Sequence, residues 1–533
     1  MRRHARLLIP VAMVALYLAA VNDQWPPKSD SALYVGLGRS LARGEGMRFN
    51  GLDQWGIPPA VPVLLAGCRL LVGEHYWLPN LVMTAAGLGV IALAWATARQ
   101  VATALPRPWR DPLAFGTVVI VSTSGRLFID STCLMTDVPC TLLLTTGVYA
   151  LLRWRDRPWV AYPVMAAAML LATLTRIPAG VFAVGLGAAA VLEAWRRPDR
   201  WRRLAILGGL VVAAAALFGA WAAVVRARAD PAAIDYLSPE HASLFSLTDP
   251  GRWAVRGQAL LRLPEALTSS VVYQKLSWFG LVPLALILVG WWGLARRRQW
   301  VLVGPAVAYL LFLVVLGTVG SRYLLAIVPL TVPTMLVGLL EVTTPLRRRL
   351  ARTAHRLRRR ARAGARPGTV RRLVRAGRWI AIVAVPVTAA VCAAVSLPKV
   401  GREIYWMRHP DFYRVFDGGR WQHYEALADH LRRTADPDTD RCLGPNGNVI
   451  HYWSGVVCRS DLHLEGQWYL HLHGLPAETL ARFAAESDYT RLVVPMDEGT
   501  WSDRVLPALA ATGAFDPQVT RFGPMALVRR RAE

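Results

Sequence analysis

Cysteine and acidic residues are both scarce in this sequence. Its 533 residues contain six cysteines, and 35 Asp and Glu stand against 61 Lys and Arg, which gives a formal net charge of +26. Six cysteines are too few for a disulfide framework. Glycine-rich phosphate loops, serine-hydrolase elbows and repeats of fixed period are missing as well. These absences argue against a soluble nucleotide-sugar enzyme, a serine hydrolase and a repeat protein.

Metal-binding patterns are weak. The tail histidines His471 and His473 have no second liganding pair at zinc spacing. The sequence still leaves a divalent metal open as a cofactor. Cys442 and Cys458 lie in the same polar tail. A tail outside the cytoplasm favours a bridge between them, whereas two free thiols are the alternative, and the sequence does not separate the two.

Long apolar runs are abundant instead. Hydrophobic residues make up 54% of the chain, a share typical of proteins whose apolar helices cross the bilayer. About eleven runs have roughly spanning length, so we predict a mainly α-helical polytopic membrane protein. The predicted spans are 7–22, 78–98, 112–124, 134–152, 158–174, 178–194, 204–225, 277–294, 300–318, 322–341 and 379–397.

The arginines test this count. Basic clusters precede the first run and recur at 107–110, 153–157, 196–203, 296–298 and 347–378. With eleven spans all of them fall on one side, which the positive-inside rule makes the cytoplasm. Because the arginines sit between apolar runs, the charge indicates the topology of an inner (cytoplasmic) membrane protein and not a nucleic-acid partner. The first run has no clear cleavage site, and we interpret it as an uncleaved span.

The charge pattern divides the chain into four parts. Residues 1–345 form a membrane domain with large outward loops at 23–77 and 226–276. Residues 346–378 contain no acidic residue, which predicts a basic cytoplasmic linker or an amphipathic segment against anionic headgroups. A last span at 379–397 leads to 398–533, a predicted small α/β extracytoplasmic domain. Its expected helices are 421–433 and 476–486, and its expected strands are 491–495 and 525–528.

Asp30 is the first candidate for chemistry. It follows the first span at the outer mouth of the membrane domain. A carboxylate there can take a proton from an attacking hydroxyl within hydrogen-bond reach. Tyr34 lies one helical turn further, so both side chains can face one cavity. The alternative is that Asp30 caps a helix beginning at Ser31, and a cap and a base are not exclusive.

Asp137 is the second candidate. It lies at the outer end of the predicted span 134–152, and ionisable residues at membrane depth are functional candidates by default. Arg126 and Asp130 precede it on the same outward turn. One of them can pair with Asp137 or hold a phosphate. The structural alternative is an ion pair between Arg126 and Asp130, which share a helix face at a spacing of four residues.

Two outward arginines run against the basic-inside bias. Arg176 lies between two spans, and Arg322, followed by Tyr323, opens another span at the same level. Arginine's planar fork binds phosphate through two parallel hydrogen bonds, which makes both residues candidates for holding the phosphate of a lipid. The alternative is that their side chains snorkel to the interface.

Five short motifs follow one another along the first part of the chain. They are Asp30 to Tyr34, Gly44-Glu45-Gly46, Pro58-Pro59, Thr136-Asp137, and Arg322-Tyr323 with Pro329. In order and membrane side they resemble the multispan glycosyltransferases of the GT-C fold, and within them the protein O-mannosyltransferase and lipid A aminoarabinose transferase group. The similarity covers about residues 1–340.

The resemblance implies an inverting transferase with a polyprenyl-phosphate-linked sugar as donor, working at the outer membrane face. Asp30 matches the family's catalytic acid and Asp137 its second site acid. The chain departs from the family pattern at three places. Ser29 stands where members often have a second acid, Gly56-Ile57 where aminoarabinose transferases have Glu-Lys, and Ala60 where glycine is usual.

The sequence thus predicts a membrane glycosyltransferase that moves a sugar to an envelope acceptor, which is a lipid, a glycan or a protein. The alternative is a polytopic lipid or solute transporter without transferase activity. A transporter predicts internal repeats and charged residues near the membrane midplane. The candidate charges here cluster at the outer ends of the spans instead, which favours transfer.

Overall fold

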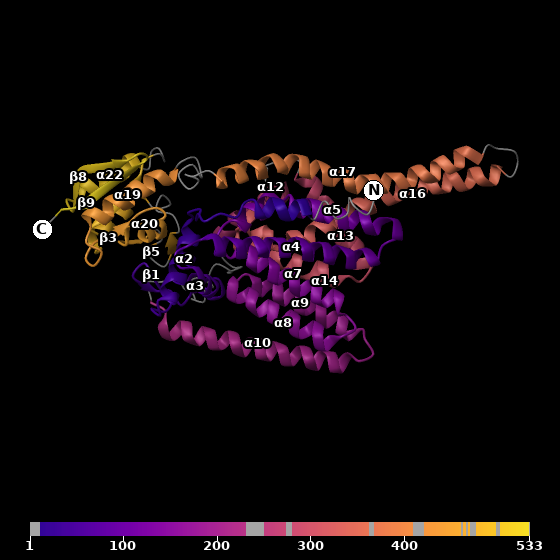
Figure 1. The fold of residues 1–533 in the computed structure, drawn as a ribbon, viewed down its shortest axis with the longest axis horizontal. Helices are drawn as coiled ribbons and strands as arrows, with labels where there is room; N and C mark the ends of the chain where they lie inside the picture. The colour runs from indigo at the N-terminus through magenta and orange to yellow at the C-terminus, as the bar shows by residue number, and fades with distance from the viewer. Residues whose placement is uncertain are drawn as a thin grey trace.

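The computed structural model describes residues 11–230, 250–272, 280–361, 367–408, 420–459, 462–464, 467–469, 476–496 and 502–531. The molecule is elongated, with apolar helices in its middle (Figure 1). The strand-rich C-terminal part lies at one end, and the helical hairpin of α16 (Val328–Ala361) and α17 (Pro367–Met407) projects from the other (Figure 1).

Helices dominate the chain before the C-terminal part. The described elements that precede α16 are, in chain order, α2 (Ser29–Ala42), β1 (Arg48–Phe49), β2 (Leu52–Asp53), α3 (Ala60–Val72), α4 (Trp77–Thr103), η1 (Arg107–Trp109), α5 (Arg110–Ser122), α6 (Gly125–Ser131), α7 (Asp137–Arg153), α8 (Pro158–Thr175), α9 (Ala179–Trp195), α10 (Arg200–Arg228), α12 (Pro250–Val272), α13 (Leu281–Arg296), α14 (Trp300–Leu316), α15 (Ser321–Leu324) and η2 (Leu325–Ile327).

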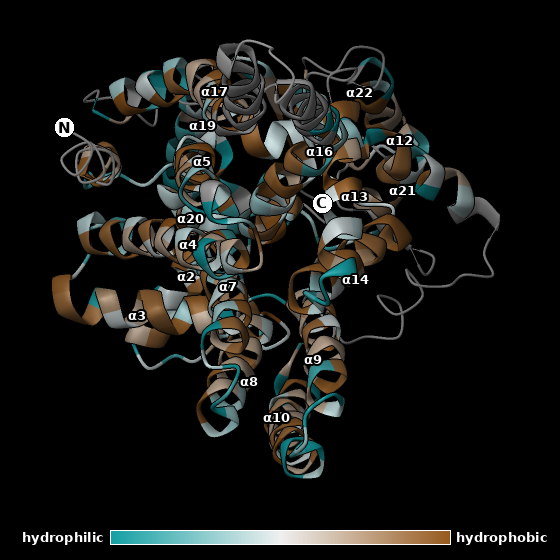
Figure 2. Ribbon diagram, turned by 90° about the vertical axis from the view of Figure 1, so that its right-hand side faces the viewer, coloured by the Kyte–Doolittle hydropathy of each residue, from teal (hydrophilic) through white to brown (hydrophobic). Residues whose placement is uncertain are grey.

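Several of these helices suit a bilayer. Within the described residues, five helices are long and apolar enough to cross a membrane, and the bent pair α5 and α6 makes a sixth; α3, α9, α13 and α14 are shorter apolar helices. Of the five, α10 leaves the most apolar surface uncovered by protein, since only 6% of its apolar stretch is buried. Figure 2 looks along the bundle and shows apolar residues on its outer faces. The predicted runs from 78 onward lie largely on helices, while the total of eleven spans stays a prediction. The runs 7–22 and 277–294 begin outside the described residues.

Close helix packing depends on small residues. A side chain at Gly338 of α16 would collide with the backbone of Leu286 on α13, and one at Gly290 of α13 with the backbone of Thr334 on α16. Glycine lets the two backbones approach, which replaces the hydrophobic driving force that is absent between helices in lipid. This pair brings α16 close against α13.

The basic stretch predicted as a linker is largely helical. α16 has 34 residues, or about 50 Å at 1.5 Å per residue, which exceeds the roughly 30 Å of the hydrocarbon core. α17 starts at Pro367. The arginine-rich segment therefore continues two helices beyond the bundle, and its cytoplasmic side stays a prediction.

The C-terminal part is built around a five-stranded sheet in the order β4-β3-β7-β9-β8. The pairs β3–β4 and β3–β7 are parallel, and β7–β9 and β8–β9 are antiparallel. The predicted segments 421–433, 476–486, 491–495 and 525–528 fall on α19, α21, β7 and β9. The bounds are α19 (Arg420–Thr434), β3 (Arg441–Leu443), α20 (Gly447–Ser454), β4 (Val457–Arg459), β5 (Leu462–Leu464), β6 (Gln467–Tyr469), α21 (Ala477–Glu486), β7 (Arg491–Pro495), α22 (Ser502–Ala511), β8 (Phe515–Phe522) and β9 (Met525–Arg530).

The segment predicted as the first outward loop, residues 23–77, is fastened to this C-terminal part. Asn50, between β1 and β2, accepts a hydrogen bond from the backbone N–H of Cys458 at 2.8 Å and donates to its carbonyl. The Asn50 N–H in turn donates to His451 Nε2 at 3.2 Å. These bonds place the C-terminal part over the loop that carries Asp30.

Candidate functional site at the outer helix ends

Asp137 lies at the centre of a charged cluster. It is the first residue of α7 and its side chain is 1% exposed. A carboxylate in the first turn of a helix is stabilised by the helix dipole. Both of its oxygens are occupied: Oδ1 pairs with Arg176 Nη1, and Oδ2 lies 2.9 Å from Arg322 Nε. Asp137 is therefore a buried anion held by two cations.

Arg322 connects Asp137 to Asp30. Its Nη1 lies 2.7 Å from Asp30 Oδ2 while its Nε contacts Asp137. The residue belongs to α15, a single turn that follows the left-handed Gly317 at the end of α14. The planar guanidinium can serve both carboxylates at once because its donors point in fixed, different directions.

Arg176 completes the cluster from a third direction. It ends α8 in an extended conformation, which turns the chain toward α9. Its guanidinium carbon lies 4.8 Å from the centroid of the Tyr323 ring, within the range of a cation–π contact. The sequence-predicted residues Asp30, Asp137, Arg176, Arg322 and Tyr323 are thus brought together.

Arg126 and Asp130 form a pair of their own. α5 and α6 are bent by 54°, and the bend falls at Ser124, whose side chain caps α6 by accepting from the Leu127 N–H. On α6, Arg126 Nε and Nη2 lie 2.7 and 2.8 Å from the two oxygens of Asp130. The predicted ion pair at four-residue spacing is confirmed. The Arg126 guanidinium also interacts with the negative charge of Asp137, so the pair borders the cluster.

Asp30 is the accessible carboxylate of the cluster. α2 begins at Ser29 and its N-cap is Lys28, so the alternative that Asp30 caps a helix starting at Ser31 is wrong. Its side chain is 46% exposed, against 1% for Asp137. Of these two acids, Asp30 is the one that an external hydroxyl can reach.

Tyr34 stands beside Asp30 on the same helix face. Its hydroxyl hydrogen-bonds the side chain of Thr136, and burial, followed by the negative charge of Asp30, raises the pKa of Tyr34 to about 12. The phenol therefore stays protonated at neutral pH. It can orient a bound group but cannot act as a base.

Lys28 is a charged neighbour that the sequence reasoning missed. Burial acts to lower the pKa of Lys28, but Cys133 and Asp130 outweigh burial and raise it, and the Lys28 side chain hydrogen-bonds that of Cys133. The ammonium therefore stays charged beside the Arg126–Asp130 pair. Its signal in the sequence was a lysine two residues before the candidate base.

The cluster does not fit a divalent metal. Among the residues that the structure describes, no group of three His, Cys, Asp or Glu side chains is placed to hold an ion. Arg322 also occupies the position between Asp30 and Asp137, where a metal shared by the two acids would have to sit. We derive no step through a metal.

Comparison with known proteins rests on structure. No protein-family model and no curated protein matches the sequence. Among solved structures, ArnT from Cupriavidus metallidurans bound to undecaprenyl phosphate is similar with a TM-score of 0.54 and 15% identity, over 99% of this chain and 98% of that one. Its apo state gives 0.56 and 16% over the same shares.

The chain has the GT-C fold. A second similar structure is the archaeal oligosaccharyltransferase AglB from Archaeoglobus fulgidus, in complex with an inhibitory peptide and a dolichol-phosphate. Its TM-score is 0.51 at 12% identity, over 95% of this chain and 72% of that chain. The GT-C resemblance predicted from the motifs is thereby confirmed at the level of the fold.

Proposed function

We propose that this protein is a membrane glycosyltransferase that moves a sugar from a polyprenyl-phosphate donor to an envelope acceptor on the outer face of the membrane. The single observation that carries the proposal is the bridge from Arg322 to both Asp30 and Asp137. In this bridge an accessible carboxylate, that of Asp30, lies in direct contact with a cation. ArnT and AglB, whose structures contain polyprenyl phosphates, support a donor of the same class.

Asp30 is the proposed base. In an inverting displacement the acceptor oxygen attacks the anomeric carbon and its proton passes to a carboxylate. The bond from that carbon to the phosphate oxygen breaks, and its electron pair leaves with the lipid phosphate. Phosphate is a good leaving group, so orientation of the acceptor and stabilisation of the departing charge remain for the protein.

Arg322 and Arg176 are the proposed partners of the departing phosphate. The side chain of Arg322 is 27% exposed, so part of its guanidinium is available to a ligand. Fixed cations next to developing negative charge need no reorganisation during the reaction. We assign Tyr34 and Tyr323 to lining the donor sugar, and Arg126, Asp130 and Lys28 to the border of the same region.

Asp137 has a different proposed role from Asp30. Since both of its oxygens pair with arginines and its side chain is buried, it has no free oxygen with which to receive a proton from an acceptor. We assign it to holding Arg176 and Arg322 in place.

Replacement of Asp30 tests the proposal in cells. The Asp30→Asn variant keeps the shape of the side chain and removes the base, and we expect mass spectrometry of envelope glycans and glycoproteins to show the loss of one sugar addition. Asp53→Asn is the matched control, because Asp53 is an exposed acid in the same outward loop. Unchanged glycosylation with Asp30→Asn would refute the assignment. A change in lipid or solute transport without a missing sugar would favour the transporter alternative.

A further inference from the structure

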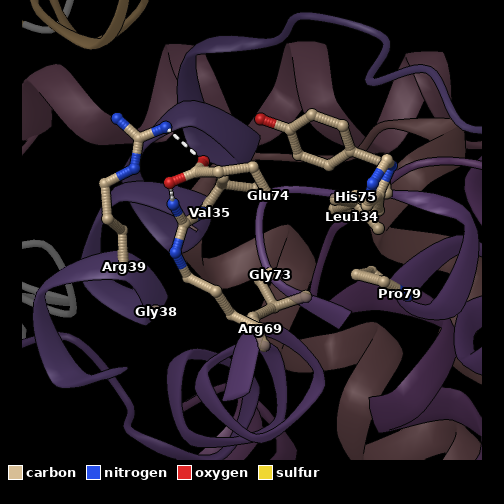
Figure 3. Close-up of a pocket in the computed structure, with 11 residues that line it drawn as sticks. Val35, Gly38, Arg39, Arg69, Gly73, Glu74, His75, Pro79 and Leu134 are labelled. Atoms are coloured by element: carbon tan, nitrogen blue, oxygen red, sulfur yellow. Dashed lines mark hydrogen bonds and ion pairs between the residues drawn. The ribbon is translucent and has the colours of Figure 1, made fainter. Parts of the chain in front are cut away.

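A pocket opens between α2, α3 and the start of α4, lined on one wall by Val35 and Leu134 (Figure 3). Two arginines point into it, Arg39 from the last turn of α2 and Arg69 from the last turn of α3. Both pair with Glu74, and Arg39 Nη2 lies 2.9 Å from its Oε2. Figure 3 shows the two guanidiniums converging on this single carboxylate.

Positive charge exceeds negative charge in this pocket. Two guanidiniums share the single Glu74 carboxylate, and burial, followed by the positive charge of Arg39, lowers the pKa of Arg69. Within the described part of the chain, Arg39 Nε is buried without a hydrogen-bond partner. The Glu74 side chain is 59% exposed, against 15% for Arg69. The Glu74 carboxylate is therefore the solvent-facing member of this contact.

Two features beside the pocket are typical of the membrane–water interface. α3 exposes two consecutive leucines, Leu70 (71%) and Leu71 (80%), right after Arg69. The apolar helix α4, long enough to cross the membrane, begins at Trp77, and tryptophan is enriched at the membrane–water interface. Glu74 lies between these two points. A short helix with apolar residues exposed beside arginine is typical of a segment lying in the interface.

We propose that this pocket binds the headgroup phosphate of an anionic phospholipid of the outer leaflet. The phosphate takes the place of the Glu74 carboxylate between Arg39 and Arg69, since guanidinium forks bind phosphate through parallel hydrogen bonds. The C-terminal part closes the site: Arg39 donates to the Tyr452 hydroxyl at 3.0 Å and lies 4.6 Å from its ring centroid. This site is separate from the Asp30 cluster, and its test does not require transferase activity.

Lipid retention tests the proposal. The full chain is placed in nanodiscs of phosphatidylcholine with phosphatidylglycerol and then released into detergent. Native mass spectrometry measures how much phosphatidylglycerol stays bound to it. We expect the double variant Arg39→Gln/Arg69→Gln to retain less phosphatidylglycerol by about fivefold for each arginine removed. Arg48→Gln, an exposed arginine on β1 of the same loop, should retain it like the parent chain. Equal retention by the double variant overturns the proposal.

Glu74→Gln gives an opposite and independent result. It keeps both cations and removes their competing anion, so phosphatidylglycerol retention should rise even if the double variant does not fold. If the arginine–glutamate contact is only structural, Glu74→Gln lowers thermal stability without any gain in retained lipid, which contradicts the proposal. Inorganic phosphate distinguishes a lipid from a free anion. If inorganic phosphate raises the melting temperature as much as phosphatidylglycerol does, the assignment to a lipid is wrong.

Discussion

The Arg322 guanidinium lies 2.7 Å from the Asp30 carboxylate, although the two residues come from opposite ends of the membrane domain in sequence. The contact joins α2 to α15, the single turn before η2 and α16. Because the same guanidinium reaches Asp137, the exposed acid and the buried acid respond to one cation. This arrangement leads to several predictions.

Arg322→Lys should lower transfer without unfolding the protein. One ammonium is a point charge on a flexible stem and cannot hold two carboxylates in fixed directions. Loss of one charge-assisted hydrogen bond of about 1.5–3 kcal/mol corresponds to roughly a 10- to 100-fold loss of rate. The measurement is sugar transfer by the purified variant, together with its melting temperature. The control is Arg297→Lys, because Arg297 pairs with Glu341 at 2.5 Å outside the cluster. This variant should transfer the sugar at the parental rate.

Asp137→Asn should destabilise the membrane domain. The change leaves Arg176 and Arg322 without their shared buried anion, and breaking a buried ion pair by removing one partner costs about 3–5 kcal/mol. Thermal unfolding in detergent measures the effect. Asp156→Asn removes an exposed acid, 82% accessible and 3.0 Å from Arg197, and should change stability by less than about 1 kcal/mol. Equal stability of the two variants would show that Asp137 does not hold the arginines.

Mild acid should loosen the C-terminal part from the first loop. His451 Nε2 accepts from the Asn50 N–H, so the proton is on Nδ1, which donates to the Val456 carbonyl at 2.9 Å. Burial lowers the pKa of His451 below its usual 6.5. The unfolded state then binds more protons than the folded state, so stability falls as the pH drops below about 6.5.

Hydrogen exchange at the Asn50 amide measures this effect. Exchange corrected for its intrinsic pH dependence should be faster at about pH 5 than at pH 7. The His451→Gln variant carries no titratable group at this position and should lose the difference. A pH-independent opening of the parent chain would contradict the role given to His451.

Cys442 and Cys458 should form a disulfide if the C-terminal part is extracytoplasmic. The two residues are direct partners in the parallel register of β3 and β4, and both are buried. Directly opposed residues on neighbouring strands lie within the separation that a bridge requires, and an oxidising compartment maintains it. Mass spectrometry of peptides digested without reductant should find the two linked. Both thiols free in protein taken from the membrane would place this part on the reducing side.

Much of the membrane part could be predicted from the sequence because its signals are local. Apolar runs of spanning length identified most of the membrane-part helices from 78 onward, but they missed α12 (Pro250–Val272), which falls in the predicted loop 226–276. Asp30, Asp137, Arg176 and Arg322 were recognisable because ionisable residues at the outer ends of spans need a specific reason to be there. Their side chains come from α2, α7, α8 and α15, and the order of the motifs indicated that they share one site.

The pairing within the site could not be predicted in the same way. That Arg322 serves two acids depends on the placement of α15, which packs against α12. Lys28 was missed because a lysine before a helix is typical of a solvated loop, and only the fold brings it next to Cys133 and Asp130. The contact of Arg39 with Tyr452 joins residues 413 positions apart, and no periodicity relates them. The sharp bend between α5 and α6 depends on the cap at Ser124, which hydropathy does not register.

The central claim is that Asp30 takes the proton of the attacking hydroxyl, and one assay tests it most directly. Purified parent chain, Asp30→Asn and Asp53→Asn are each given a panel of polyprenyl-phosphate sugars with envelope acceptors, and single-turnover transfer is followed. The account predicts a rate lower by about 10²–10⁴-fold for Asp30→Asn, with Asp53→Asn equal to the parent. Transfer by Asp30→Asn at the parental rate would contradict it.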